Sequence, residues 1–138
     1  MAAVIDPQLF VKSISVASPF FDPDGGGRFK LRGLCEALTL TRKDIAAITG
    51  KQPQWFQDYW ADRFVRTTDS EVREVIEQLL LIYVLVTNLC KEEAQSKLWL
   101  RLPNPAFENR TPANLIVTGE LPRVRDTLID LMTGGVPA

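Results

Sequence analysis

The segment 71–88 limits most strongly how this chain can fold. Its apolar residues recur every three or four positions, which is the period of a helix, and Asp69 or Ser70 precedes it as a cap. Its longest uninterrupted apolar run, residues 79–86, is too short to cross a bilayer, because a spanning helix needs about 18–20 apolar residues. We therefore expect one long buried helix at the centre of the protein, with no membrane span.

The second half of this helix is apolar on every side, because Leu81, Ile82 and Leu85 lie outside the face that the first half presents. A helix of this kind is enclosed by other helices or by a second subunit. A chain of 138 residues has limited surface with which to cover it. We therefore expect self-association as a symmetric homodimer.

The chain from Phe29 onward follows the same helical period, and no strand pattern of comparable strength is present. We therefore predict an all-α fold. In the helix that follows the central one, Ala94, Leu98 and Trp99 should point inward. The further helices are expected over residues 29–40, 42–49, 54–64, 91–102, 112–117 and 122–132.

Histidine is absent from the sequence, and this excludes several kinds of site. Histidine is the commonest general base and metal ligand near neutral pH, so catalytic triads and histidine-containing zinc sites are ruled out. Cys35 and Cys90 have no CxxC partner and lie among apolar residues, so we interpret them as buried reduced thiols. We predict no catalytic residue, no metal and no cofactor.

The first ten residues lack the basic region, the apolar stretch and the small-residue cleavage site of a signal peptide. We therefore expect a cytoplasmic protein. Further along, residues 18–27 are rich in turn-forming residues and include three consecutive glycines. We interpret them as a linker behind an N-terminal arm.

The segment 38–60 can be laid on a helix-turn-helix template. Ala46 and Gly50 have the spacing of the small residue in the first helix and of the glycine in the turn. Thr49 and Lys51 stand where apolar residues are usual, so the helix-turn-helix is degenerate. The chain carries 16 Lys and Arg against 17 Asp and Glu, so any DNA contact must be local. The expected DNA contacts are Arg42, Lys43, Lys51, Gln52 and Gln54.

In this interpretation residues 52–60 form the recognition helix. Glutamines would then read adenine edges while the cations hold phosphates. The alternative is that the segment is only a helical packing unit or a dimer surface. The sequence leaves both open.

A series of short motifs between residues 98 and 119 is the most specific signal in the chain. Proline stops one helix, an Asn-Pro pair fixes a turn, an aromatic residue anchors it, and Thr-Pro starts the next helix. The motifs are Leu98-Trp99-Leu100, Pro103-Asn104-Pro105-Ala106-Phe107, Arg110-Thr111-Pro112, Leu115-Ile116 and Thr118-Gly119.

Together these motifs resemble the toxin-binding domain of the Xre/MbcA/ParS antitoxin family. The resemblance extends over about residues 30–132, although Glu108 and Asn109 stand where the family usually has glycine. It implies an N-terminal arm and linker over residues 1–28, an Xre-like helical domain over 29–68, and a helical toxin-binding domain with a flexible tail over 69–138.

The same resemblance implies a partner, a RES-domain toxin that consumes NAD or transfers ADP-ribose from it, whose cleft the antitoxin covers. A cleft that binds pyrophosphate favours arginine, whose planar fork pairs with anionic groups. Alternatively, the arginines pair with carboxylates on a solvated face and the tail is a frayed terminus. The expected toxin-binding residues are Arg101, Arg110, Arg123 and Arg125, with Thr133, Gly134, Gly135 and Val136 of the tail.

The sequence leaves two functions in competition. The first is an antitoxin of a RES-domain toxin, with repression of its own operon as an additional role. The alternative is a stand-alone Xre-like DNA-binding transcription regulator. An enzyme is disfavoured, because the chain has no histidine and no phosphate loop.

Overall fold

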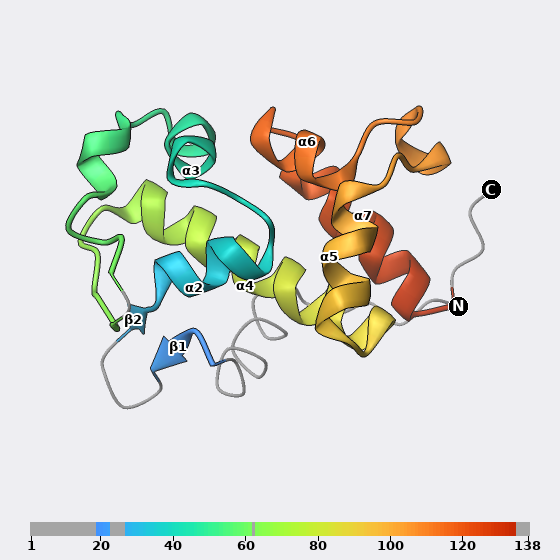
Figure 1. The fold of residues 1–138 in the computed structure, drawn as a ribbon, viewed down its shortest axis with the longest axis horizontal. Helices are drawn as coiled ribbons and strands as arrows, with labels where there is room; N and C mark the ends of the chain where they lie inside the picture. Colours follow the sequence, from blue (N-terminus) through green and yellow to red (C-terminus); the bar gives the residue numbers. More distant parts are fainter. Residues whose placement is uncertain (1–18, 23–26, 62, 135–138) are drawn as a thin grey trace.

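The computed structural model of the chain describes residues 19–22, 27–61 and 63–134. It confirms the all-α fold, with one small antiparallel sheet as the exception (Figure 1). In chain order the elements are β1 (Phe21–Asp22), β2 (Arg28–Phe29), α2 (Leu31–Ala37), α3 (Arg42–Thr49), the 3₁₀ helix η1 (Pro53–Phe56), α4 (Ser70–Cys90), α5 (Glu93–Arg101), the 3₁₀ helix η2 (Pro105–Phe107), α6 (Pro112–Val117) and α7 (Leu121–Met132).

Helix α4 is the central helix that the sequence predicts, and Asp69 is its cap, accepting a hydrogen bond from the Val72 N–H at 3.0 Å. Helices α2 and α3 pack on its first part and α5 and α7 on its second, so that α4 runs through both halves of the molecule (Figure 1). We call residues 27–69 the N-terminal half and residues 91–134 the C-terminal half.

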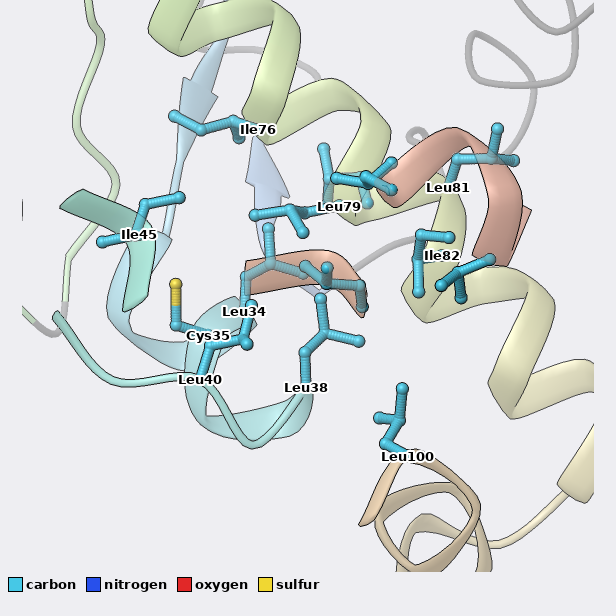
Figure 2. Packing of buried hydrophobic residues seen from close by; sticks show 14 of the residues in the cluster. Leu34, Cys35, Leu38, Leu40, Ile45, Ile76, Leu79, Leu81, Ile82 and Leu100 are labelled. Atoms are coloured by element: carbon cyan, nitrogen blue, oxygen red, sulfur yellow. The ribbon is translucent and has the colours of Figure 1, made fainter. Parts of the chain in front are cut away.

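Leu81, Ile82 and Leu85 are between 0% and 2% exposed within the single chain. Figure 2 shows side chains of α2, α4 and α5 converging, with Leu38 and Leu100 near Ile82. Other helices of the same chain therefore cover the face that we expected to need a second subunit. This removes the reason given for a homodimer.

The first helix is shorter than expected, because Phe29 belongs to a strand. Its N–H and carbonyl both pair with Val65 at 2.8 Å, and it also pairs with Phe21 of β1. These bonds hold the backbone extended, so α2 begins only at Leu31. The next helix, α3, follows the prediction: Thr41 and Asp44 form a capping box, and Gly50 ends it with φ 72°.

The helix expected over residues 54–64 is wrong. The structure has only the single 3₁₀ turn η1, which Pro53 begins, followed by irregular turns. Trp55 stacks on Tyr59, with ring centroids 4.9 Å apart, so the aromatic residues pack on one another in a compact turn. Val65, further along the chain, exchanges two backbone hydrogen bonds with Phe29 and is extended there. The recognition helix predicted over residues 52–60 is therefore not formed.

The inward face predicted for α5 is wrong for Ala94 and Leu98, whereas Trp99 packs partly buried against the core. Ser96 and Leu100 are the buried residues, whereas Ala94 is exposed, Leu98 is 51% exposed and Trp99 is half-buried. Leu98 and Leu100 are two positions apart, which is a rotation of about 200° around a helix. The two leucines therefore point to opposite sides. The prediction placed Leu98 in the core, whereas Leu100 is the leucine that is buried.

Candidate functional site

The segment 102–111 forms a compact corner between α5 and α6. Asn104 organises it: its Oδ1 accepts from the N–H of Ala106 at 2.9 Å, and its carbonyl accepts from Asn109 at 3.0 Å. Its own N–H donates to the Arg110 carbonyl at 3.1 Å. These bonds satisfy backbone groups that no helix serves, so the corner is a defined structure.

Two consecutive residues of this corner, Glu108 and Asn109, have positive φ angles of 51° and 64°. These are the positions at which we noted the family's usual glycine, and the left-handed conformation explains that preference, because glycine adopts it without strain. Asn109 tolerates it well, but a glutamate does so less readily. The Glu108 carboxylate is held by the Arg123 guanidinium at 2.8 and 2.9 Å.

Phe107 anchors the corner to the core, since it is 0% exposed. The Arg123 guanidinium lies over its ring at 5.5 Å, and the same group donates to the Ala106 carbonyl at 3.2 Å. Arg123 therefore closes the outer side of the corner against α7.

Arg110 makes three side-chain hydrogen bonds. Its Nη1 donates to Glu120 at 2.7 Å, its Nη2 to Thr118 at 2.8 Å and its Nε to Asn114 at 3.1 Å. Glu120 also lies 3.7 Å from Arg123. We call Glu108, Arg110, Glu120 and Arg123 the corner network. The side chains of Arg110 and Arg123 are each 38% exposed, and their donors hold the corner to α6 and α7.

The other two predicted arginines lie outside the corner network. Arg101 is exposed at the end of α5 and donates to the carbonyl of Thr39 at 3.1 Å, which links the C-terminal half to the turn after α2. Thr39 has a φ of 62°, uncommon for a β-branched residue, so this bond stabilises a strained turn. Arg125 pairs only with its neighbour Asp126, at 3.0 Å.

The predicted tail residues begin where α7 ends. The Thr133 hydroxyl donates back to the Ile129 carbonyl at 2.9 Å, and Gly134 has a φ of 72°. Both residues are exposed. Gly135 and Val136 lie outside the described residues.

The five predicted DNA contacts do not lie on one helix. Arg42 and Lys43 are exposed in the first turn of α3, whereas Gln52 and Gln54 are exposed at η1. Lys51 is committed to the fold: its Nζ lies 3.0 Å from the Asp69 carboxylate and 5.2 Å from the centre of the Trp55 ring. Lys51 is therefore held by contacts within the fold, whereas the other four predicted DNA contacts are exposed.

The contact with Lys51 also acts on Asp69. The pKa of the Asp69 carboxyl is lowered, first by the N–H of Val72 and then by the Lys51 ammonium. The carboxylate therefore caps α4 in its charged form at neutral pH.

Sequence reasoning missed the exposed apolar side chains. Among the described residues, the large hydrophobic side chains that are exposed are Leu98 and Leu102 near the end of α5 and Leu131 and Met132 at the end of α7. The helical period carried no signal for them, because it assigned Leu98 to the core.

Both cysteines are reduced, as predicted. Cys35 is buried and Cys90 half-buried, and burial raises the pKa of both thiols. Over the part of the chain that the structure describes, no group of side chains is suited to a metal ion. In the same residues no helix has the length and hydrophobicity of a membrane span.

Comparisons with known proteins point to one family. The family model for the antitoxin Xre/MbcA/ParS C-terminal toxin-binding domain matches residues 85–132, which begin inside α4 and include the corner. The mycobacterial cidal antitoxin MbcA of Mycobacterium tuberculosis and that of Mycobacterium bovis are each 32% identical over 104 residues. That alignment covers 75% of this chain and 88% of each relative.

A solved structure agrees with the sequence relatives. The crystal structure of the M. tuberculosis MbcT-MbcA toxin-antitoxin complex contains a chain that superimposes with a TM-score of 0.53 at 26% identity. The match covers 79% of this chain and 95% of that one. The extent of the sequence match, the motifs of the corner and the shared fold together show that this chain belongs to the Xre/MbcA/ParS antitoxin family.

Proposed function

We propose that this chain is an antitoxin that binds a cognate RES-domain toxin and blocks its NAD-consuming or ADP-ribosylating activity. The observation that carries the proposal is the likeness to an antitoxin solved together with its toxin, which extends over 95% of that chain. The protein acts in the cytoplasm by binding alone, without cofactor or catalysis, in keeping with a sequence that has no histidine.

The C-terminal half is the part that covers the toxin's cleft. The corner network gives it a rigid shape, since Arg110 and Arg123 direct their donors to Glu108, Glu120 and nearby oxygens. Their role is to shape the surface. Arg101 and Arg125, which lie outside that network, are the arginines that meet anionic groups of the toxin.

The tail residues Thr133, Gly134, Gly135 and Val136 enter the cleft. Thr133 follows directly from α7, whose last turn is exposed. A short segment of small residues suits a narrow cleft, because it presents its backbone groups without a bulky element behind them.

The test is co-expression with the RES-type protein encoded by the neighbouring reading frame, with cell growth as the readout. The full chain should protect the cells. Deletion of residues 133–138 and the variant Arg125→Glu should each weaken protection, because a carboxylate facing anionic groups costs several kcal/mol at an interface. Lys43→Glu makes the same charge change in the N-terminal half and is the matched control. Full protection by the truncated and the Arg125→Glu proteins would place neutralisation on another surface.

Repression of its own operon is a second role, and one observation favours it. Arg42 and Lys43 are exposed and belong to no ion pair among the described residues. They are available for phosphates, with Gln52 and Gln54 nearby in sequence and exposed. A homodimer would serve this role, because operators with two-fold symmetric half-sites are bound by dimers with the same two-fold symmetry. Operator binding without any toxin partner would favour the stand-alone transcription regulator instead.

A further inference from the structure

Helix α5 presents apolar side chains on two opposite faces. Ser96 and Leu100 face the core at 3% and 0% exposure, whereas Leu98 and Leu102 face outward at 51% and 50%. Leu98 and Leu102 are four positions apart and lie one above the other, with the exposed Ala94 one turn before them. We call Ala94, Leu98 and Leu102 the α5 stripe. A helix that is apolar on both faces is normally covered on both.

The position of the stripe in the chain is informative. The exposed large hydrophobic side chains of the described chain are Leu98, Leu102, Leu131 and Met132, and all four fall within residues 85–132. This is the segment matched by the family's toxin-binding domain. The N-terminal half folds with aromatic residues in abundance, yet its described residues include no exposed large hydrophobic side chain. The exposed apolar surface is thus confined to the part of the chain that the proposed function assigns to the toxin.

The residues around the stripe are polar and of mixed charge. Lys91, Glu92 and Glu93 are exposed at one end and Arg101 at the other, and Gln95 is exposed beside it. An apolar centre with a charged and polar rim is the arrangement of a protein interface. The complementary surface is an apolar groove with a polar edge.

We infer that Leu98 and Leu102 are the apolar anchors by which this antitoxin docks into an apolar groove of its toxin. The inference rests on the proposed function and adds a recognition site to it. The interaction is a helix laid into a groove, in which residues four positions apart supply the contacts. It lies apart from the arginine and tail contacts described above, so the two can be tested separately.

A second copy of this chain fits the stripe less well than a toxin does. A symmetric pair brings the same patch against itself. The stripe is too short for such a pair, since α5 covers only Glu93–Arg101, whereas a stable interface buries about 800 Å² per partner.

The experiment compares the double variant Leu98→Ala/Leu102→Ala with Gln95→Ala, which lies on the same helix beside the stripe. Alanine keeps the helix and removes only the apolar contact. The readout is the Kd for the purified RES-type protein from the neighbouring reading frame, with the unaltered chain as reference. We expect the double variant to bind about 30-fold more weakly or worse, as the loss of an interface hot spot does. We expect Gln95→Ala to bind within about threefold of the unaltered chain, as rim positions do.

Each other outcome has a distinct meaning. Equal binding by the double variant and the unaltered chain would overturn the inference and leave the proposed function standing. Failure of the unaltered chain to bind would overturn both. The thermal midpoint of the double variant should match that of the unaltered chain, and a large fall would show that the stripe packs within the fold. If the unaltered chain forms a dimer and the double variant does not, the stripe binds a second copy of the chain. This result, or a large fall in the thermal midpoint, would overturn the inference.

Discussion

The two halves of the molecule pack on the same helix but differ in what they leave at the surface. The N-terminal half gathers its aromatic side chains around η1, with Trp55 stacked on Tyr59 and Phe56 fully buried. The C-terminal half has shorter loops and a rigid corner, yet it leaves Leu98 and Leu102 half-exposed. The difference teaches that exposed apolar surface here does not reflect a lack of packing partners. It is concentrated where a partner protein is expected.

The two halves also hold their irregular segments in different ways. In the N-terminal half, backbone pairing between Phe29 and Val65 fixes the position of Val65, beyond the turns that follow η1. In the C-terminal half, side chains of the corner network fix the turn between α5 and α6. Substitution of single side chains should therefore disturb the C-terminal irregular segment more readily.

The largest expected effect comes from Phe56 and Phe107, two fully buried phenylalanines, one in each half. Phe56→Ala and Phe107→Ala should each lower the free energy of unfolding by about 3–5 kcal/mol, because each leaves a cavity at a position that is 0% exposed. Leu98→Ala should cost less than about 1 kcal/mol, because its side chain is already half in water. Urea denaturation measures all three. An equally large destabilisation by Leu98→Ala would contradict the contrast between buried and exposed apolar residues.

A smaller effect is expected from the corner network. Arg110→Ala removes three hydrogen bonds and leaves Glu120 without its closest cation. The free energy of unfolding should fall by about 1–2 kcal/mol, since the site is partly exposed and water replaces some of the bonds. Arg125→Ala is the matched control and should change the free energy of unfolding by less than about 0.5 kcal/mol, because its only ion pair is with the exposed carboxylate of its chain neighbour Asp126. Equal effects of the two variants would mean that the network does not hold the corner.

The cap of α4 predicts a dependence on pH. The pKa of Asp69 is lowered in the folded chain by the Val72 N–H and by Lys51, so its carboxylate stabilises the fold above its unfolded pKa. That contribution is lost as the pH falls through the lowered, folded pKa. Asp69→Asn should therefore be less stable than the unaltered chain at pH 7, and the difference should shrink as the pH falls below about 4. Thermal midpoints at pH 7, 5 and 3 measure it, and a difference that does not change with pH would count against the ionised cap.

The smallest effect on stability is expected from the exposed cations of the N-terminal half. Arg42→Ala/Lys43→Ala should leave the thermal midpoint unchanged, because neither side chain has an ion-pair partner among the described residues. Binding to DNA from upstream of its own gene should weaken, and its salt dependence should flatten by roughly one unit of slope for each phosphate that is no longer bound. Lys51 is left in place because it serves Asp69. Unchanged DNA affinity would assign this surface to packing alone.

Sequence reasoning succeeded where the signal is local. The cap at Asp69, the helix start at Thr111 and the turn at Gly50 are each set by a few neighbouring residues, and all are found in the structure. The corner motifs were readable for the same reason.

Sequence reasoning failed where contacts between residues far apart in the sequence determine the local structure. The helix over residues 54–64 gave way to a pairing between Phe29 and Val65, which no local pattern encodes. The face of α5 was misassigned because Leu98 and Leu100 are equally apolar, and only the packing of α5 against α4 and α6 decides that Leu100 is buried. The partners of Arg110 and Arg123 depend on how α6 and α7 meet, so the arginines could be identified from the sequence but their carboxylates could not.

The course of α4 through both halves has a consequence for how the protein can be divided. The segment that the family's toxin-binding domain model matches begins at residue 85, inside a helix that starts at Ser70. A fragment cut there would lose Leu79, Leu80 and Ile82, which are buried side chains of the helix on which α5 and α7 pack. The matched segment and the folding unit are therefore not the same piece of chain. The amide protons of α4 should be the slowest in the chain to exchange with solvent. Proteolytic cleavage within one half should unfold the other half as well.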